Sequence, residues 1–336
     1  MPRMTLCAAA FGLAAAFAPA GPPATVLGVD GAQFTLSGRP TFLLGMSYYG
    51  ALGARDPVVR ADLDDMRRRG FNWVRVWATW NAFGEDASAV DGEGRAREPY
   101  MGRLRRLLAD CDRRGMVVDI TLCRGVDPEG RAVLGTAGTL GRAATTLATA
   151  LRSRRNWYLD MANERNIGDR RFVSFDELKQ VRAALRRADP WRLATASQGG
   201  DIGRDEMREY IETAGVDLLC PHRPRSAGSP AETAVRTREY RAWMRALGRT
   251  APVHYQEPFR RGYGDWQPGR DDFLSDLRGA VDGGAAGWCL HNGSTRRAPG
   301  ERPRRSFDLR ERRLFEQLDP VERAVADAVG AVVARR

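Results

Sequence analysis

The stretch WYLDMANE, residues 157–164, shows the unit from which the chain is built. Its apolar first part is typical of a short buried strand, and it ends in two polar residues, Asn163 and Glu164. Apolar residues at helical spacing follow over residues 175–188. The segment therefore predicts a buried strand, a polar loop and a helix.

The same alternation of strand and helix runs through the rest of the chain. Strands are predicted at residues 42–46, 73–77, 116–122, 157–162, 193–196, 216–220, 253–256 and 286–290. Helices are predicted at residues 57–69, 100–113, 137–151, 175–188, 204–214, 231–247 and 270–281, with a closing helix inside 309–333. Eight such repeats favour a parallel sheet closed into a (β/α)8 TIM barrel of the α/β class. Turn residues within 26–40 add a small N-terminal β-hairpin at the bottom of the barrel.

Length and composition fit one domain of this kind. With 336 residues and 43% hydrophobic content, the chain can bury one barrel core, and we assign residues 21–336 to a single domain. The first predicted strand is not followed by a glycine-rich phosphate-binding motif. This absence argues against a dinucleotide-binding fold.

Residues 1–20 have the composition of a secretory signal peptide. Met-Pro-Arg is followed by an apolar run over residues 4–17 and then by the small-residue segment at 18–20. A membrane anchor is the alternative, but the run is shorter than the ~20 residues that span a bilayer. We therefore expect cleavage near Gly21, secretion to an extracellular or periplasmic compartment, no stable membrane insertion, and a monomer.

Charge and cysteine usage exclude several classes of partner. Basic residues number 53 against 42 acidic ones, but the arginines are spread over many predicted elements. A nucleic-acid-binding protein would gather them on one face. Three histidines and no Cys-x-x-Cys motif give a metal or cofactor no support. Small buried thiols, with disulfide pairing left open, are expected at Cys111, Cys123, Cys220 and Cys289.

Glu257 follows the predicted strand at residues 253–256 as Glu164 follows its own strand. The C-terminal ends of barrel strands lie at one face, where barrels of this kind hold their active sites. Two facing carboxyl groups there can cleave a glycosidic bond, one protonating the leaving oxygen while the other attacks or stabilises the sugar. Helix capping or ion pairing by the two glutamates is the alternative.

The other predicted strand ends carry polar and aromatic side chains. They are Tyr48, Tyr49, Arg75, Trp77, Trp80, Cys123, Arg124, Ser197, Gln198, His222, Tyr255, Trp288, His291 and Asn292. Aromatic faces suit the C–H surfaces of sugar rings, so we expect an oligo- or polysaccharide partner. Strand alternation predicts that His254 points toward the helices, and Trp73 and Trp157 are expected in the core.

With these motifs, the chain resembles the retaining glycoside hydrolases of the cellulase (family 5-like) group in clan A, over nearly the whole predicted mature chain. The resemblance implies hydrolysis of β-linked glycans, mannan-like or glucan-like, by a two-glutamate double displacement. Glu164 would then be the acid/base and Glu257 the nucleophile.

The resemblance also implies roles for neighbouring residues. Arg75 would hold the nucleophile, Asn163 would bind the sugar 2-hydroxyl, and Trp288 would form the platform under the ring. Tyr255 or His222 would support the nucleophile. The substrate-binding residues are therefore predicted to be Arg75, Trp77, Tyr48, Asn163, His222, Tyr255 and Trp288.

Two properties of the glutamate pair are expected. An arginine beside Glu257 should keep that carboxylate ionised, whereas a dry aromatic setting should raise the pKa of Glu164 enough for it to hold a proton. Retention further requires carboxyl groups about 5 to 5.5 Å apart, while a separation beyond ~6.5 Å would favour inversion.

The chain departs from the family pattern at two strand ends. His-Arg-Pro at 222–224 stands where the family often has His-x-Tyr, and Cys-Arg at 123–124 stands where histidine is common. These changes leave the sugar open, and Arg124, Arg223 and Arg225 could bind an acidic sugar instead. A carbohydrate-binding barrel without turnover and a transglycosylase are the alternatives, and the sequence decides neither the linkage nor endo against exo attack.

Overall fold

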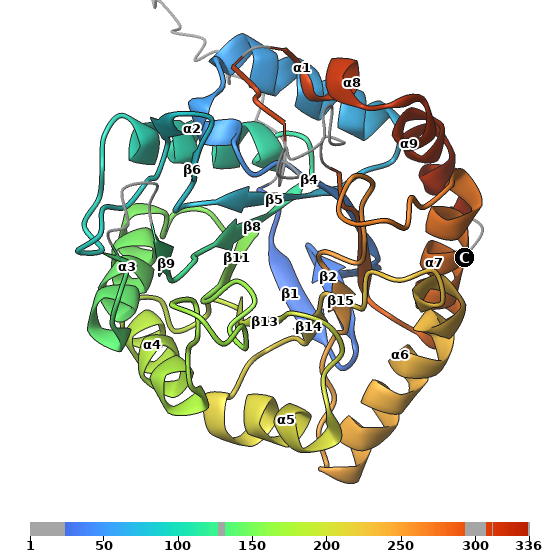
Figure 1. Cartoon of the computed structure of the whole chain (residues 1–336). Helices are drawn as coiled ribbons and strands as arrows, with labels where there is room; N and C mark the ends of the chain where they lie inside the picture. Colours follow the sequence, from blue (N-terminus) through green and yellow to red (C-terminus); the bar gives the residue numbers. More distant parts are fainter. Residues whose placement is uncertain (1–23, 127–131, 293–306, 311, 335–336) are drawn as a thin grey trace, which may run out of the picture.

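Parallel strands form a central sheet that is ringed by helices (Figure 1). The structure is a computed structural model and describes residues 24–126, 132–292, 307–310 and 312–334. The predicted signal peptide, residues 1–20, lies outside the described residues.

The central strands close into a barrel. They are β4 (Leu43–Ser47), β5 (Trp73–Trp77), β8 (Val117–Thr121), β11 (Trp157–Asp160), β12 (Ala194–Thr195) with its continuation β13 (Ser197–Gln198), β14 (Cys220–Pro221), β15 (His254–Tyr255) and β16 (Gly287–Leu290). Parallel pairing gives the order β12-β11-β8-β5-β4-β16-β15. β13 pairs with β14, and a parallel bridge from Leu219 to Val253 links β14 to β15. The predicted (β/α)8 barrel is confirmed.

The helices cover the outer face of this sheet (Figure 1). They are α1 (Asp56–Arg68), α2 (Tyr100–Asp112), α3 (Ala137–Ala150), α4 (Phe175–Ala188), α5 (Arg204–Arg208), α6 (Ser229–Ala246), α7 (Arg270–Gly283), α8 (Leu314–Gln317) and α9 (Pro320–Val333). The helix predicted at 204–214 is divided, because a π-helical segment, η2 (Glu209–Ala214), continues α5. Short elements in the loops are η1 (Ala51–Gly53), β6 (Asn81–Ala82), β7 (Glu85–Asp86), β9 (Gly125–Val126) and β10 (Ala132–Val133).

Capping residues fix where helices begin. Ser174 precedes α4, and its hydroxyl accepts the backbone N–H of Glu177 at 3.2 Å while the Glu177 carboxylate accepts the Ser174 N–H at 2.9 Å. Asp319 and Glu322 form the same reciprocal pair at the start of α9. Both pairs satisfy N–H groups that the first helical turn leaves without intrahelical partners.

A small antiparallel sheet fills the bottom of the barrel. It contains β1 (Leu27–Asp30), β2 (Gln33–Leu36) and β3 (Arg39–Thr41), so the predicted hairpin is present with a third strand added. Phe34 of β2 is fully buried, and its ring lies 6.4 Å from that of Tyr158 and 5.6 Å from that of His254. Both partners are on barrel strands, so this sheet seals the N-terminal ends of the strands.

Two glycines make room for the large rings at this end. A Cβ atom on Gly45 of β4 would lie 2.0 Å from a ring carbon of Trp73 and 2.4 Å from its carbonyl oxygen. A Cβ atom on Gly287 of β16 would lie 2.6 Å from the ring of His254. Real Cβ contacts are not this short, so glycine is required where these rings cross the neighbouring strand.

In the described part of the chain, none of the helices combines the length and hydropathy that crossing a membrane requires. The side chains of Cys111, Cys123, Cys220 and Cys289 are buried, as predicted.

We predict that Gly45→Ala destabilises the protein by about 2 to 3 kcal/mol or more, because overpacking forces Trp73 or its strand to move. Urea denaturation of wild type and variant measures the effect. Gly138→Ala, at an exposed position in α3, is the matched control and should be neutral or stabilising by up to about 1 kcal/mol. Equal stability of Gly45→Ala and wild type would contradict the close fit of Trp73.

Candidate active site

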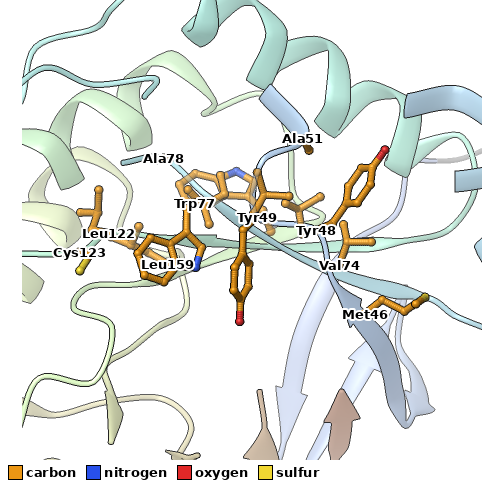
Figure 2. Close-up of a cluster of buried hydrophobic side chains, with 14 of the residues drawn as sticks. Met46, Tyr48, Tyr49, Ala51, Val74, Trp77, Ala78, Leu122, Cys123 and Leu159 are labelled. Atoms are coloured by element: carbon orange, nitrogen blue, oxygen red, sulfur yellow. The ribbon is translucent and has the colours of Figure 1, made fainter. Parts of the chain in front are cut away.

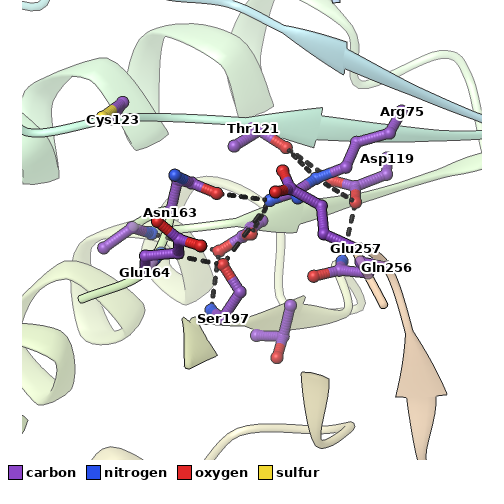
Figure 3. Close-up of polar contacts among 12 residues, drawn as sticks. Arg75, Asp119, Thr121, Cys123, Asn163, Glu164, Ser197, Gln256 and Glu257 are labelled. Carbon is purple, nitrogen blue, oxygen red and sulfur yellow. Dashed lines mark hydrogen bonds and ion pairs between the residues drawn. The ribbon is translucent and has the colours of Figure 1, made fainter. Parts of the chain in front are cut away.

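Glu164 and Glu257 lie together at one end of the barrel (Figure 3). Glu164 follows β11 and Glu257 follows β15, so both come from the C-terminal ends of parallel strands. One carboxylate oxygen of each lies within 4.8 Å of the other. This is the face at which barrels of this kind carry their chemistry.

Arg75 connects Glu257 to the barrel interior (Figure 3). Its guanidinium is fully buried and donates to Glu257 Oε1 at 2.5 Å, to Asp160 Oδ2 at 2.6 Å and to Asn163 Oδ1 at 3.1 Å. Its Nε atom lies 3.2 Å from Asp119 Oδ2. Arg75 therefore carries one positive charge into contact with three carboxyl groups from three barrel strands.

Asp119 keeps the charge of this network in balance. Burial raises the pKa of Asp119 to about 8, against the lowering effect of Arg75. The direction of this shift favours the protonated form of Asp119. The net charge that Arg75 must neutralise is then smaller, which favours a stable network in a low-dielectric interior.

The two carboxylate oxygens of Glu257 have different partners. Oε1 accepts hydrogen bonds from the Tyr49 hydroxyl and from Arg75, whereas Oε2 lies 3.1 Å from Arg225 and 3.6 Å from His222. Burial alone would raise the pKa of Glu257, but the charges of His222, Arg75, His291 and Arg225 hold it well below its usual value. Glu257 is therefore an ionised carboxylate, as the sequence predicted.

Glu164 does not have the expected raised pKa. Burial favours its neutral form, but the hydrogen bond and charge of His222 and the charge of Arg225 outweigh burial and lower the pKa of Glu164. Its Oε1 lies 3.2 Å from His222 Nδ1 and 3.3 Å from Arg225 Nη2, and Arg171 lies 3.6 Å from Oε2. The expectation of an aromatic, uncharged setting is therefore wrong, because basic groups surround this carboxyl.

The backbone at Glu164 is in the left-handed region, with φ +46. Its N–H donates to Ser197 Oγ at 3.0 Å, which ties the loop after β11 to β13. Non-glycine residues rarely adopt this conformation, and it persists where surrounding contacts enforce it, often at functional sites. The carboxyl group is thus held toward Glu257 by a fixed loop.

Trp288 and Tyr255 do not lie in the site. Trp288 Nε1 donates to Asp276 of α7 at 2.7 Å, and the Tyr255 hydroxyl is 2.6 Å from the Thr237 hydroxyl of α6. Both rings are fully buried between barrel and helices. The predicted platform role of Trp288 and the predicted support of the nucleophile by Tyr255 are therefore wrong.

His254 faces the barrel interior, opposite to the prediction. Its Nδ1 lies 3.1 Å from the Tyr158 hydroxyl, and its ring is 4.5 Å from that of Trp73. The pKa of His254 falls to about 3 because burial disfavours its charged form. Adjacent residues of a strand face opposite sides of the sheet, so the inward position of His254 and the outward position of Tyr255 follow from each other. The core positions predicted for Trp73 and Trp157 are confirmed.

Tyr49, rather than the predicted Tyr48, reaches the site. Figure 2 shows the two rings pointing in opposite directions, and the Tyr48 hydroxyl donates to Asp62 of α1 at 3.0 Å. Trp77 packs beside Tyr49 with ring centres 5.3 Å apart. Within the described residues, the buried Nε1 of Trp77 has no hydrogen-bond partner, so this donor is available to a ligand.

Of the three arginines considered for an acidic ligand, Arg225 alone contacts the glutamates. Arg124 pairs with Glu177 at 2.8 Å and with backbone oxygens. Arg223, with φ +57, pairs with Asp201 and donates to the Ser229 carbonyl at 2.9 Å. Arg124 and Arg223 therefore have structural partners of their own.

Distance alone would allow a metal ion between Glu164, His222 and Glu257, whose ligand atoms lie within 4.8 Å of one another. The same carboxylate oxygens, however, already contact the guanidinium groups of Arg75 and Arg225. Two positive charges at this distance disfavour a cation. We therefore describe the cluster as an acid/base site rather than a metal centre.

Comparison with known proteins identifies the fold. The sequence matches no family model and no curated protein. The structure resembles the endo-1,4-β-mannanase from Rhizomucor miehei, with TM-score 0.65 and 12% identity over 93% of this chain and 100% of that one. It also resembles GH5_18 from Streptomyces cattleya, solved with GlcNAc, with TM-score 0.61 and 20% identity over 87% and 80% of the two chains. A β-1,4-D-mannanase from Cryptopygus antarcticus has TM-score 0.61 and 13% identity over 91% and 94%.

The chain has the fold of the family 5 glycoside hydrolases. In this barrel, five predicted residues come together, namely Arg75, Asn163, Glu164, His222 and Glu257, with Trp77 beside them. The structure places Tyr48, Tyr255 and Trp288 against the helices instead.

The sequence analysis missed several residues of the site. Asp119 and Asp160, which were not named, contact Arg75. Tyr49 was named at a strand end but left out of the substrate-binding set, and it contacts Glu257. A signal was present for the aspartates, because each lies within an otherwise mostly apolar strand, as Arg75 does. Charges in such strands must be paired when buried.

We predict that Arg75→Met lowers the free energy of unfolding by about 3 to 5 kcal/mol, because it leaves buried carboxyl groups without their cation. Arg106→Met is the matched control: Arg106 pairs with Asp56 at an exposed position, and its loss should cost less than about 1 kcal/mol. Denaturant unfolding measures both, and similar small losses would show that Arg75 does not stabilise the barrel.

The raised pKa of Asp119 predicts a pH dependence. Between its ordinary value of 3.8 and about 8, the folded protein holds a proton that the unfolded chain has released. Through this group, stability falls by at most about 1.4 kcal/mol per unit rise in pH. Asp119→Asn removes the effect, so its stability relative to wild type should increase as pH rises. Urea unfolding across this window tests it, and parallel curves would contradict it.

Proposed function

We propose that the protein is a secreted retaining glycoside hydrolase that cleaves β-linked glycans of the mannan or glucan kind. The main support is the position of Glu164 and Glu257 at the C-terminal ends of β11 and β15, with one carboxylate oxygen of each within 4.8 Å of the other. The second support is the contact of Arg75 with Glu257, which favours an ionised nucleophile.

In the proposed reaction, Glu257 attacks the anomeric carbon and forms a glycosyl ester. Glu164 gives its proton to the departing glycosidic oxygen, so the bond to the leaving sugar breaks as the ester forms. Glu164 then removes a proton from water, and the water oxygen displaces Glu257 and restores its carboxylate. Because Arg75 and Tyr49 hold Oε1, the attacking atom is Oε2.

Retention is favoured over inversion by the separation of the two groups. Retaining enzymes hold their carboxyl groups about 5 to 5.5 Å apart, whereas inverting enzymes need roughly 6.5 Å or more to admit water. One oxygen of Glu164 and one of Glu257 lie within 4.8 Å of each other, which is closer to the retaining than to the inverting arrangement.

The remaining parts of the proposal have separate support. Structures named as mannanases have this fold, which favours a mannan-like glycan. Residues 1–20 have the composition of a secretory signal, which favours action in an extracellular or periplasmic compartment.

A carbohydrate-binding barrel without turnover is the second candidate. It is favoured by one observation, the contact of Arg225 with both glutamates, since this guanidinium stands where a sugar would be cleaved. A protein of this kind would bind oligosaccharide and release no product. A transglycosylase would share the ester intermediate and pass it to a sugar instead of water.

We predict that the full chain releases reducing sugar from at least one polymer among β-mannan, β-glucan, xylan and uronate-bearing glycans. Glu257→Ala should lower kcat by about a thousandfold or more, because the ester cannot form. Glu93→Ala, at an exposed glutamate, is the matched control and should retain activity. If the folded wild-type protein releases no reducing sugar from any of these polymers, the carbohydrate-binding barrel would be favoured.

Azide separates the roles of the two glutamates. In Glu164→Ala, azide should attack the Glu257 ester and give a glycosyl azide of retained configuration. In Glu257→Ala, it should attack from the face that the nucleophile has left and give the inverted product. Proton NMR of the azides distinguishes these outcomes, and the reverse pattern would exchange the assigned roles.

A further inference from the structure

Arg225 bridges the two glutamates. Its Nη2 atom lies 3.3 Å from Glu164 Oε1 and 3.1 Å from Glu257 Oε2, and its side chain is 16% exposed. The guanidinium carbon is 4.3 Å from the centre of the Tyr263 ring. The loop between β14 and α6 thus inserts a cation between the groups that would act on a glycosidic bond.

A sugar positioned for cleavage has to displace this guanidinium. Its glycosidic oxygen must meet Glu164 and its anomeric carbon must meet Glu257, yet one nitrogen of Arg225 contacts both carboxylates. Displacement removes both of these partners from Arg225. A largely buried cation without partners is costly, so the ligand has to replace what it removes.

Arg260 adds a second cation beside the first. It is 4% exposed, and its guanidinium carbon lies 5.5 Å from the centre of the Tyr263 ring that Arg225 also contacts. Within the described residues, Arg260 pairs with no carboxylate and donates one hydrogen bond, to the Arg261 carbonyl at 3.3 Å. Burial and the charge of Arg225 lower its pKa to about 10. A neutral sugar offers neither cation a counter-charge.

We propose that the substrate carries an anionic substituent, a carboxylate as in a uronic acid or a sulfate ester, and that Arg225 and Arg260 bind it. This inference rests on the proposed function and narrows its substrate class to β-linked glycans that carry acidic groups, as distinct from neutral mannan or glucan. Guanidinium groups bind planar or tetrahedral oxyanions through paired N–H···O hydrogen bonds. Tyr263 is 46% exposed, so the ring between the two arginines lies where a ligand can reach it.

Binding of the anion also prepares the acid. While Arg225 contacts Glu164, its charge helps to keep that carboxyl ionised. When the substrate draws Arg225 away, one of the charges that lower the pKa of Glu164 is removed, while His222 remains; this shifts Glu164 toward the protonated form that the leaving oxygen needs. The anion therefore links substrate recognition to protonation of the acid.

The first test measures binding, so that it does not depend on turnover. Calorimetry of the full chain compares methyl β-D-glucuronide, methyl β-D-glucoside and the 6-sulfate of the glucoside. We expect the carboxylated or sulfated sugar to bind at least about tenfold more tightly than the neutral one. Arg225→Gln should abolish this preference, and Arg225→Lys should retain part of it. Arg60→Gln, at an exposed position in α1, should retain all of it.

Comparison of the two charged sugars distinguishes a carboxylate from a sulfate ester as the anionic group of the substrate. Preference for the glucuronide alone assigns a uronic acid, and preference for the sulfate alone assigns a sulfate ester; either supports the proposal. Equal binding of neutral and anionic sugars, no binding of either, or a preference that survives in a folded Arg225→Gln would overturn it. Thermal unfolding of each variant establishes that it is folded.

The second test uses turnover on one polymer in two forms. A uronate-bearing glycan is compared with the same glycan after its carboxyl groups have been reduced to alcohols. We expect release from the first to exceed release from the second by at least about tenfold, and Arg225→Gln to remove that ratio. Anion-selective binding without release from either form would contradict the proposed hydrolase and leave the anion site standing, whereas faster release from the reduced form would contradict the anion site.

Discussion

The buried guanidinium of Arg75 is the constraint around which the site is arranged. Arginine stays charged in a protein interior, so burial obliges the fold to supply acceptors. Here the acceptors come from β8, from β11 and from the loop after β15, through Asp119, Asp160 and Glu257. Strands far apart in the sequence are thereby fixed around one cation, and Glu257 takes its position from the same contact. Stability and the candidate chemistry depend on one side chain.

A charged centre also changes which residues belong inside the barrel. In β15, the interior positions are taken by His254 and Gln256, while Tyr255 packs against α6. In β16, Cys289 faces in and Trp288 faces α7. The outer surface of the sheet is the apolar one, because it is covered by helices, and the middle of the barrel is polar. The rings of Tyr255 and Trp288 are accordingly on the outer side of the sheet.

This reversal explains what the sequence could and could not predict. Strand and helix positions followed from apolar spacing, and Glu164 and Glu257 followed from their place after two strands. Whether Tyr48 or Tyr49 reaches the site depends on which of the two faces the barrel interior. Two adjacent tyrosines give no indication of this in the sequence. Only charged residues inside strands, such as Arg75, indicate which residues of a strand face the barrel interior, because a buried charge must face its partners.

The ionisation of Glu164 was beyond the reach of strand patterns for another reason. It is set by His222 and Arg225, which lie at and after the end of β14, and no spacing rule connects that loop to the loop after β11. Only the closed barrel brings them together.

The antiparallel sheet of β1, β2 and β3 at the bottom of the barrel has a consequence for the order of folding. Phe34 is made early in synthesis, but its partners Tyr158 and His254 come much later, and β4 pairs with the nearby β5 on one side and with the distant β16 on the other. The N-terminal strands therefore lack part of their final contacts until nearly the whole chain exists. Contacts between segments so distant in sequence make closure slow. Completion of the barrel therefore waits for its last strand, which is the second neighbour of the first.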